Sequence, residues 1–212
     1  MINIETFVFN PFQENTYLLY DHTGECIIVD AGCELPGERE ELEDFMDRHG
    51  LRPVKLINTH CHVDHILGLA YFAEKYELPF FMHAAEKGLL AHSIQQAEFF
   101  GLKMEPPPEP RGTLEEGRAV KFGESELEVI HIGGHSPGGV LFHCPGQRFL
   151  ISGDVLFRDS IGRTDLPGGD YDSLVGGIRR KLLKLDPETR VYPGHGPPTT
   201  IGDEIRNNPF LK

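Results

Sequence analysis

Three histidines and one aspartate fall within six residues of this chain, in the stretch Asn58-Thr59-His60-Cys61-His62-Val63-Asp64-His65. The stretch directly follows a run with strand character, residues 54–57. On an extended backbone His60 and His62 point to one side and Cys61 to the other. A turn would then bring Asp64 and His65 round as a second pair of ligands. Imidazole nitrogens and carboxylate oxygens suit zinc, iron or manganese, so the pattern indicates a metal site and not a solvated turn.

The elements that position these residues follow from hydrophobic period and turn residues. The predicted strands cover residues 4–9, 16–20, 26–30, 54–57, 79–82, 119–122, 127–131, 139–144, 148–151 and 190–193. The predicted helices cover residues 38–49, 84–100, 171–185 and 201–207, and another begins at residue 66. Strands in two batches, each followed by helices, predict a mixed α/β chain.

Length and composition limit the classes of protein that fit. A chain of 212 residues can bury one sizeable core, and we expect a single domain over residues 1–212. No apolar run approaches a membrane span, and residues 1–5 do not resemble a secretory signal. The four cysteines form no Cys-x-x-Cys pair, so we expect a reduced, cytoplasmic location. A net charge of −13 opposes nucleic-acid binding, and a small-molecule substrate is expected instead.

Further motifs occur later in the chain in a fixed order. They are Gly134-His135-Ser136-Pro137-Gly138, Ser152-Gly153-Asp154 and Pro193-Gly194-His195-Gly196. With the His-x-His-x-Asp-His run they resemble the signature of the metallo-β-lactamase superfamily. That resemblance implies a four-layer αββα sandwich. The run Ile161-Gly162-Arg163-Thr164-Asp165 and the tail Asn208-Pro209-Phe210-Leu211 look like the short, single-domain members of its glyoxalase II-like (hydroxyacylglutathione hydrolase-like) group.

The resemblance implies a two-metal site made of seven residues. His60, His62 and His135 would bind the first metal, Asp64, His65 and His195 the second, and Asp154 would bridge them. Zinc is the expected metal, with iron or manganese as alternatives. Asp30, in the strand-ending Asp30-Ala31-Gly32, resembles a residue that supports the metal site from outside, although an ordinary turn residue fits the sequence equally well.

The chemistry expected of such a site is hydrolysis of an acyl thioester such as S-lactoylglutathione. Two metals about 3.5–4 Å apart can share a water and lower its pKa, so that a metal-bound hydroxide attacks the carbonyl. Asp64 would also act in catalysis by orienting this hydroxide. A thiolate leaves with little help from an acid, because the pKa of a thiol is about 8.5.

Arg163 matches a basic position that holds the glutathione moiety in glyoxalase II enzymes, and an arginine suits a carboxylate. The alternative is a structural ion pair with Asp159 or Asp165. Asp165 and Gly196 also stand where those enzymes have tyrosines near the substrate.

Two other reactions remain open on the same motifs. A mononuclear iron persulfide dioxygenase shares them but would leave Asp64 and His65 idle. A lactone or phosphodiester hydrolase could use the same metal core. Metal count and oxygen consumption distinguish the dioxygenase from the hydrolases.

Overall fold

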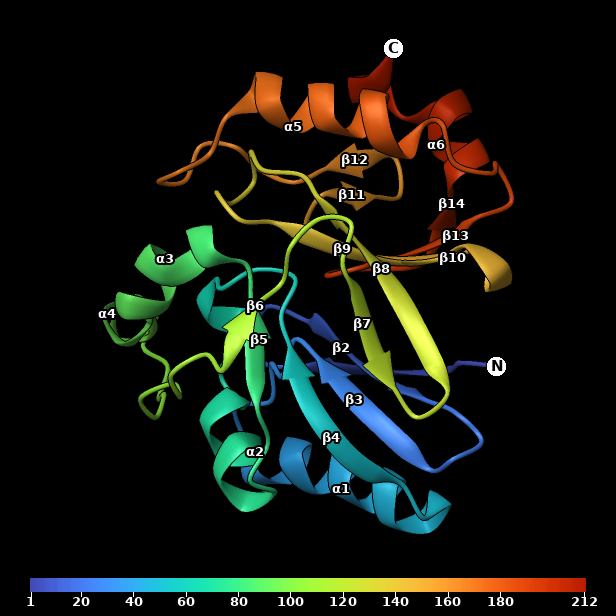
Figure 1. Cartoon of the computed structure of the whole chain (residues 1–212). Helices are drawn as coiled ribbons and strands as arrows, with labels where there is room; N and C mark the ends of the chain where they lie inside the picture. Colours follow the sequence, from blue (N-terminus) through green and yellow to red (C-terminus); the bar gives the residue numbers. More distant parts are fainter. The chain divides into compact units, whose positions relative to one another are not determined.

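The two batches of strands form two six-stranded sheets in the computed structural model, which describes all residues 1–212 (Figure 1). The chain divides into two units. The first unit comprises Met1–Thr113 and Lys121–Glu126, and the second comprises Leu114–Val120 and Leu127–Lys212. The prediction of one domain over the whole chain stays a prediction.

The sheet of the first unit keeps the order of the chain. Its strands are β1 (Asn3–Phe9), β2 (Glu14–Tyr20), β3 (Glu25–Val29), β4 (Arg52–Ile57), β5 (Phe80–Met82) and β6 (Gly112–Thr113). The first three strands are antiparallel, whereas β3 to β6 run parallel. Parallel strands need crossover segments, and α1 (Pro36–His49) and α2 (Leu69–Lys75) lie within two of them. The Asp30 and His-rich motifs therefore follow adjacent parallel strands, β3 and β4.

An apolar core fixes the helices of the first unit against its sheet. Leu42 and Met46 of α1 and Phe72 of α2 pack in one buried cluster with Ile28 and Leu56 of the sheet. Gly50 ends α1 in a left-handed conformation with φ of 62°, which favours glycine. After β5, the chain forms the short helices η2 (Ala84–Glu86), α3 (Lys87–Ala91) and α4 (Ser93–Phe99).

The other six-stranded sheet, most of whose residues belong to the second unit, has the order β14-β13-β10-β9-β8-β7. These strands are β7 (Ala119–Phe122), β8 (Ser125–His131), β9 (Val140–Cys144), β10 (Phe149–Gly153), β13 (Arg190–Pro193) and β14 (Thr199–Thr200). Strands β10 and β13 are parallel, so their carboxyl ends lie at the same edge. A small second sheet pairs β11 (Leu156–Phe157) with β12 (Ser160–Ile161).

Helices of the second unit also cover an apolar sheet face. Helix α5 (Tyr171–Gly177) continues as a π-helical turn, η4 (Ile178–Leu182), and α6 (Ile201–Asn207) follows β14. Leu174, Ile178 and Ile201 share a buried cluster with Leu150 and Val191 of the sheet. Short 3-10 turns, η1 (Val63–His65), η3 (Pro145–Gln147) and η5 (Pro209–Leu211), complete the chain.

Three predicted helices differ from the observed ones. The segment 84–100 is broken at His92, because the His92 ring takes the Gly88 carbonyl (2.7 Å) that a continuous α-helix would use. The helix predicted to begin at residue 66 begins at Leu69. Gly68 precedes it and approaches Cys33 so closely that a Cβ there would lie 2.3 Å from the sulfur.

The predicted helix 171–185 becomes π-helical after Gly176-Gly177, a pair with low helix propensity, and it ends at Leu182. The strands β6, β11, β12 and β14 are missing from the prediction. Each has only two residues, which is too short to show a period. None of the helices combines the length and the apolar character that spanning a bilayer requires.

Candidate metal centre

The His-rich motif of the first unit forms a buried loop and a 3-10 turn at the carboxyl end of β4. His60, His62 and His65 are at most 9% exposed. The His60 ring lies 4.7 Å from the His62 ring and 4.1 Å from the His65 ring, between centroids. Asp64 Oδ2 is 3.5 Å from His65 Nε2. The structure therefore brings the four predicted ligands of this unit together.

Cys61 points away from these ligands, as the alternation of an extended backbone predicts. Its sulfur lies 3.4 Å from the Met82 sulfur in the apolar core, and its backbone amide donates to the buried Glu86 carboxylate (2.8 Å). Burial raises the pKa of the Cys61 thiol well above its usual value. Cys61 is therefore a packing residue.

Asp30 supports the site from outside the ligand set. One carboxylate oxygen accepts from the Thr59 amide (2.7 Å), and the other accepts from the Thr59 hydroxyl (2.6 Å) and from His65 Nδ1 (3.0 Å). With Nδ1 bonded to a carboxylate, Nε2 of His65 is the nitrogen left to bind a metal. Of the two interpretations of Asp30, the structure supports the one in which it holds a ligand.

Two asparagines that the sequence analysis does not single out hold the backbone of the same turn. Asn10 Nδ2 lies 2.9 Å from both the Gly32 and Asp64 carbonyls, and Asn58 Nδ2 donates to the His65 carbonyl (2.9 Å). Asn10 is 54 positions from Asp64 in the chain, so no local pattern could reveal this contact.

Glu14 is a further buried acid that sequence analysis missed. Its carboxylate accepts from the Thr16 hydroxyl (2.8 Å) and lies 3.8 Å from His65 Nδ1. Burial raises the pKa of Glu14 well above its usual value, and the nearby His65 opposes this effect. Glu14 and Asp30 thus both lie beside the Nδ1 nitrogen of His65.

The second unit brings its three predicted ligands together from three strand ends. His135 follows β8, Asp154 follows β10 and His195 follows β13. Asp154 Oδ2 lies 3.6 Å from Nε2 of both histidines. The Gly194 amide donates to the Gly153 carbonyl (2.9 Å), which ties the ends of the two parallel strands together.

His135 is oriented by the backbone. Its Nδ1 bonds the Arg163 carbonyl (2.9 Å), and because a carbonyl only accepts, Nδ1 carries the proton and Nε2 points toward Asp154. Gly162 is needed beside it, since a Cβ there would lie 1.9 Å from the Asp154 carbonyl oxygen.

Arg163 carries an ion pair of its own. Its guanidinium binds Asp165 through two hydrogen bonds of 2.8 and 2.7 Å, and both side chains are exposed. Hydrogen bonding to Arg163 lowers the pKa of Asp165 to about 2. Of the predicted alternatives, the structure shows the ion pair with Asp165.

Each unit thus offers the donor set that a divalent metal requires. The donors are imidazole nitrogens and carboxylate oxygens with no thiolate, and at His65 and His135 the second ring nitrogen is already bonded to an oxygen. This anchoring by an outer partner is typical of metal-binding histidines, so the residues fit divalent metals.

Comparison with known proteins agrees with this chemistry. The family model of the metallo-beta-lactamase superfamily matches residues 9–195. Hydroxyacylglutathione hydrolase GloC from Haemophilus influenzae is 35% identical over 212 residues, covering 99% of this chain and 98% of the relative.

Two solved structures match over nearly the whole chain. The BLEG-1 B3 metallo-beta-lactamase has a TM-score of 0.90 and 35% identity, covering 99% of this chain and 100% of that one. TTHA1623 in a di-iron-bound form has a TM-score of 0.88 and 42% identity, and the match covers 98% of this chain and 100% of that one. The predicted α/β fold of the metallo-β-lactamase type is therefore confirmed. The chain belongs to the metallo-beta-lactamase superfamily and is a metal-dependent hydrolase.

Proposed function

We propose that this hydrolase cleaves acyl thioesters such as S-lactoylglutathione with two divalent metal ions. Zinc is the metal that we expect at both sites. His60, His62 and His135 would hold one ion, Asp64, His65 and His195 the other, and Asp154 both. The carrying observation is that Asp64 and His65, the pair idle in a one-metal site, lie 3.5 Å apart in a buried, hydrogen-bonded turn. The 35% identity to a hydroxyacylglutathione hydrolase supports the choice of substrate.

The metals, when bound, would lower the pKa of a shared water and polarise the substrate carbonyl. The chain's own residues orient the reaction. The Asp64 carboxylate would bind metal through one oxygen and accept a hydrogen bond from the attacking water through the other. Asp30 holds the His65 ring, and the Arg163 carbonyl holds the His135 ring, so neither imidazole rotates during turnover.

A thioester suits these residues better than an amide does. The departing thiolate has a parent pKa of about 8.5 and leaves without a dedicated proton donor. The Arg163 side chain would bind a substrate carboxylate in exchange for Asp165. Since both groups are exposed, the existing ion pair is weak enough to be replaced.

The substrate is proposed to be a small molecule of the cytoplasm, with neither nucleic acid nor membrane as a partner. The net charge of −13 would repel nucleic-acid phosphates.

Metal content and thioester turnover test the proposal together. Purified without added metal, the protein should carry close to two metal ions per chain and hydrolyse S-lactoylglutathione. Asp64→Asn should lose one metal and nearly all turnover, whereas Asp44→Asn, at an exposed position on α1, should lose neither. A protein that carries two metal ions but does not hydrolyse S-lactoylglutathione would rule out the thioester as its substrate.

A second candidate, β-lactam hydrolysis, is favoured by the 35% identity to a B3 metallo-beta-lactamase. A chromogenic cephalosporin assayed beside the thioester decides between them by the ratio of kcat/KM. A single iron per chain with oxygen uptake from a persulfide would instead establish the dioxygenase reaction.

A further inference from the structure

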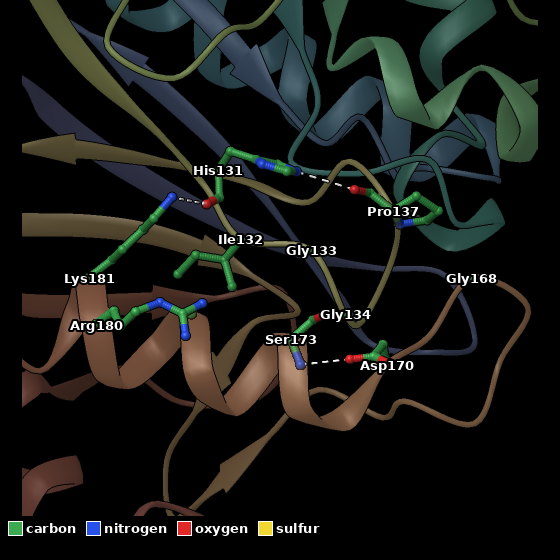
Figure 2. A pocket seen from close by; sticks show the side chains of 11 residues that line it. His131, Ile132, Gly133, Gly134, Pro137, Gly168, Asp170, Ser173, Arg180 and Lys181 are labelled. Atoms are coloured by element: carbon green, nitrogen blue, oxygen red, sulfur yellow. Dashed lines mark hydrogen bonds between the residues drawn. The ribbon is translucent and has the colours of Figure 1, made fainter.

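The second unit contains a pocket that the proposed hydrolysis does not use. It has a volume of about 400 Å³ and lies between residues 131–137, which follow β8, and the helical segment α5–η4 (Figure 2). This volume falls within the range of small-ligand sites. Four glycines and five polar or charged side chains are among the residues that line it.

The walls of this pocket are held in place by close backbone packing. A Cβ at Gly177 would lie 2.5 Å from Ile132 Cγ2, and one at Gly134 would lie 2.5 Å from the Asp170 carbonyl oxygen. The Asp170 amide also donates to the Gly134 carbonyl (2.8 Å). The helix therefore sits directly on the loop, and the pocket between them is a preformed feature.

The cations around the pocket differ in whether they already have partners. Residues 179–184 carry four cations and no acid, in a chain whose net charge is −13. Lys181 Nζ donates to Glu116 (2.6 Å) and to the His131 carbonyl (2.7 Å), and Arg179 donates to the Lys212 carbonyl (2.6 Å). Both of these side chains are therefore engaged.

Arg180 is the exception, since it forms no hydrogen bond or ion pair. Its side chain folds back along the helix, so that a Cβ at Gly176 would lie 2.7 Å from Nη1. Figure 2 shows the guanidinium in the pocket, beside the other lining side chains. Arg180 therefore leaves a full set of donors facing the pocket.

The one acid of the lining is already engaged. The Asp170 carboxylate accepts from the Ser173 amide (2.7 Å) as the cap of α5. The hydrogen bonds from Ser173 hold the pKa of Asp170 below its usual value. The uncommitted charge of the pocket is consequently positive.

We propose that this pocket is a binding site for a small organic oxyanion, a carboxylate or a phosphate ester, anchored by Arg180. A planar guanidinium with no other partner binds either group through two parallel hydrogen bonds. Ser173, on the same helical segment as Arg180, adds a hydroxyl group to the lining. The site is separate from the proposed metal ligands, although the loop that lines it also carries His135.

Calorimetric titration of the metal-loaded full chain tests this proposal, with succinate and inorganic phosphate as separate probes at constant ionic strength. Arg180→Gln should weaken binding about tenfold or more, because a charge-assisted pair is lost. Arg179→Gln removes the same charge one residue away. It should change the affinity less than about twofold, because dissolved salt screens the attraction between an exposed charge and a ligand that it does not contact. The tighter of the two probes identifies the anion class.

A variant that fills the pocket distinguishes binding inside it from simple attraction to an exposed arginine. Ser173→Tyr keeps Arg180 but occupies the space, so it should also abolish binding while the far-ultraviolet circular dichroism stays unchanged. Equal affinity in Arg180→Gln and the native chain would overturn the proposal. Equal losses of affinity in the Arg179 and Arg180 variants would also overturn it, as would binding that survives Ser173→Tyr. A third contrary result is that neither probe binds at about 10 mM, a concentration at which even a weak site would be partly filled.

Discussion

The two units hold their candidate ligands by different means. In the first unit the ligands lie within one buried run, and side chains from elsewhere in the unit secure them: Asp30 holds His65, and Asn10 and Asn58 hold the backbone. In the second unit the ligands come from three strand ends, and backbone groups position them, such as the Arg163 carbonyl that holds His135.

Burial distinguishes His65 from His195, although His135 of the second unit is also buried, at 4% exposed. The His65 side chain is 0% exposed, whereas His195 is 26% exposed. Ligands in the first unit are thus part of a core and contribute to its stability, while His195 contributes to the site alone. The first unit should respond to side-chain changes, and the second to changes that add atoms beside its backbone.

The largest contrast should come from alanine at one histidine of each unit. If the proposed two-metal site is right, both His65→Ala and His195→Ala should abolish hydrolysis, because each removes a proposed metal ligand. In the metal-free chain, His65→Ala should lower the free energy of unfolding by about 3–5 kcal/mol, because the buried Asp30 carboxylate loses its imidazole partner and keeps only the hydrogen bonds from Thr59. His195→Ala should change it by less than about 1 kcal/mol. Urea unfolding measures both, and equal losses would show that the two units are not different in this respect.

Gly162→Ala should disturb the second unit without removing any ligand. The new Cβ would lie 1.9 Å from the Asp154 carbonyl oxygen and 3.1 Å from His135 Cβ, so both ligands must shift. A displacement of about 1 Å can cost about a hundredfold in rate, so kcat/KM should fall by about that factor. Gly146→Ala is the matched control, because a Cβ there meets nothing within 4 Å. Full activity in Gly162→Ala would mean that backbone position does not limit the candidate ligands of the second unit.

Asp30→Asn tests the support from side chains in the first unit. Asp30 has a φ of 54°, which asparagine also adopts readily, so the change removes charge without adding backbone strain. Loss of such an outer partner should weaken metal binding about 10–100-fold. Competition with a chromophoric chelator measures this, and Asp47→Asn on the exposed face of α1 should leave the affinity unchanged. An unchanged affinity in Asp30→Asn would place the residue among the ordinary core contacts.

The same difference explains which residues the sequence reveals. The first-unit ligands are neighbours in the chain, so their residue types alone indicate a metal. Asp154 and His195 stand out only through motifs at strand ends, and their meeting depends on β10 and β13 being parallel, a pairing that local patterns do not encode. Asn10 and Glu14 were missed, because their roles depend on contacts with residues distant in sequence. Helix breaks such as the one at His92 depend on a side chain competing for a carbonyl.

The smallest expected effect concerns Arg163, whose backbone and side chain serve the second unit separately. Arg163→Gln keeps the carbonyl that binds His135, so metal content and kcat should stay within about twofold of the native values. The melting temperature should also stay constant, because an exposed ion pair contributes little. If the guanidinium binds the substrate carboxylate, KM for S-lactoylglutathione should rise about tenfold, since a charged hydrogen bond is lost.

Asp165→Asn should have the opposite effect and lower KM, because it removes the group that competes for Arg163. If KM stays the same in both variants, the Arg163–Asp165 pair is only structural, and the substrate handle lies elsewhere.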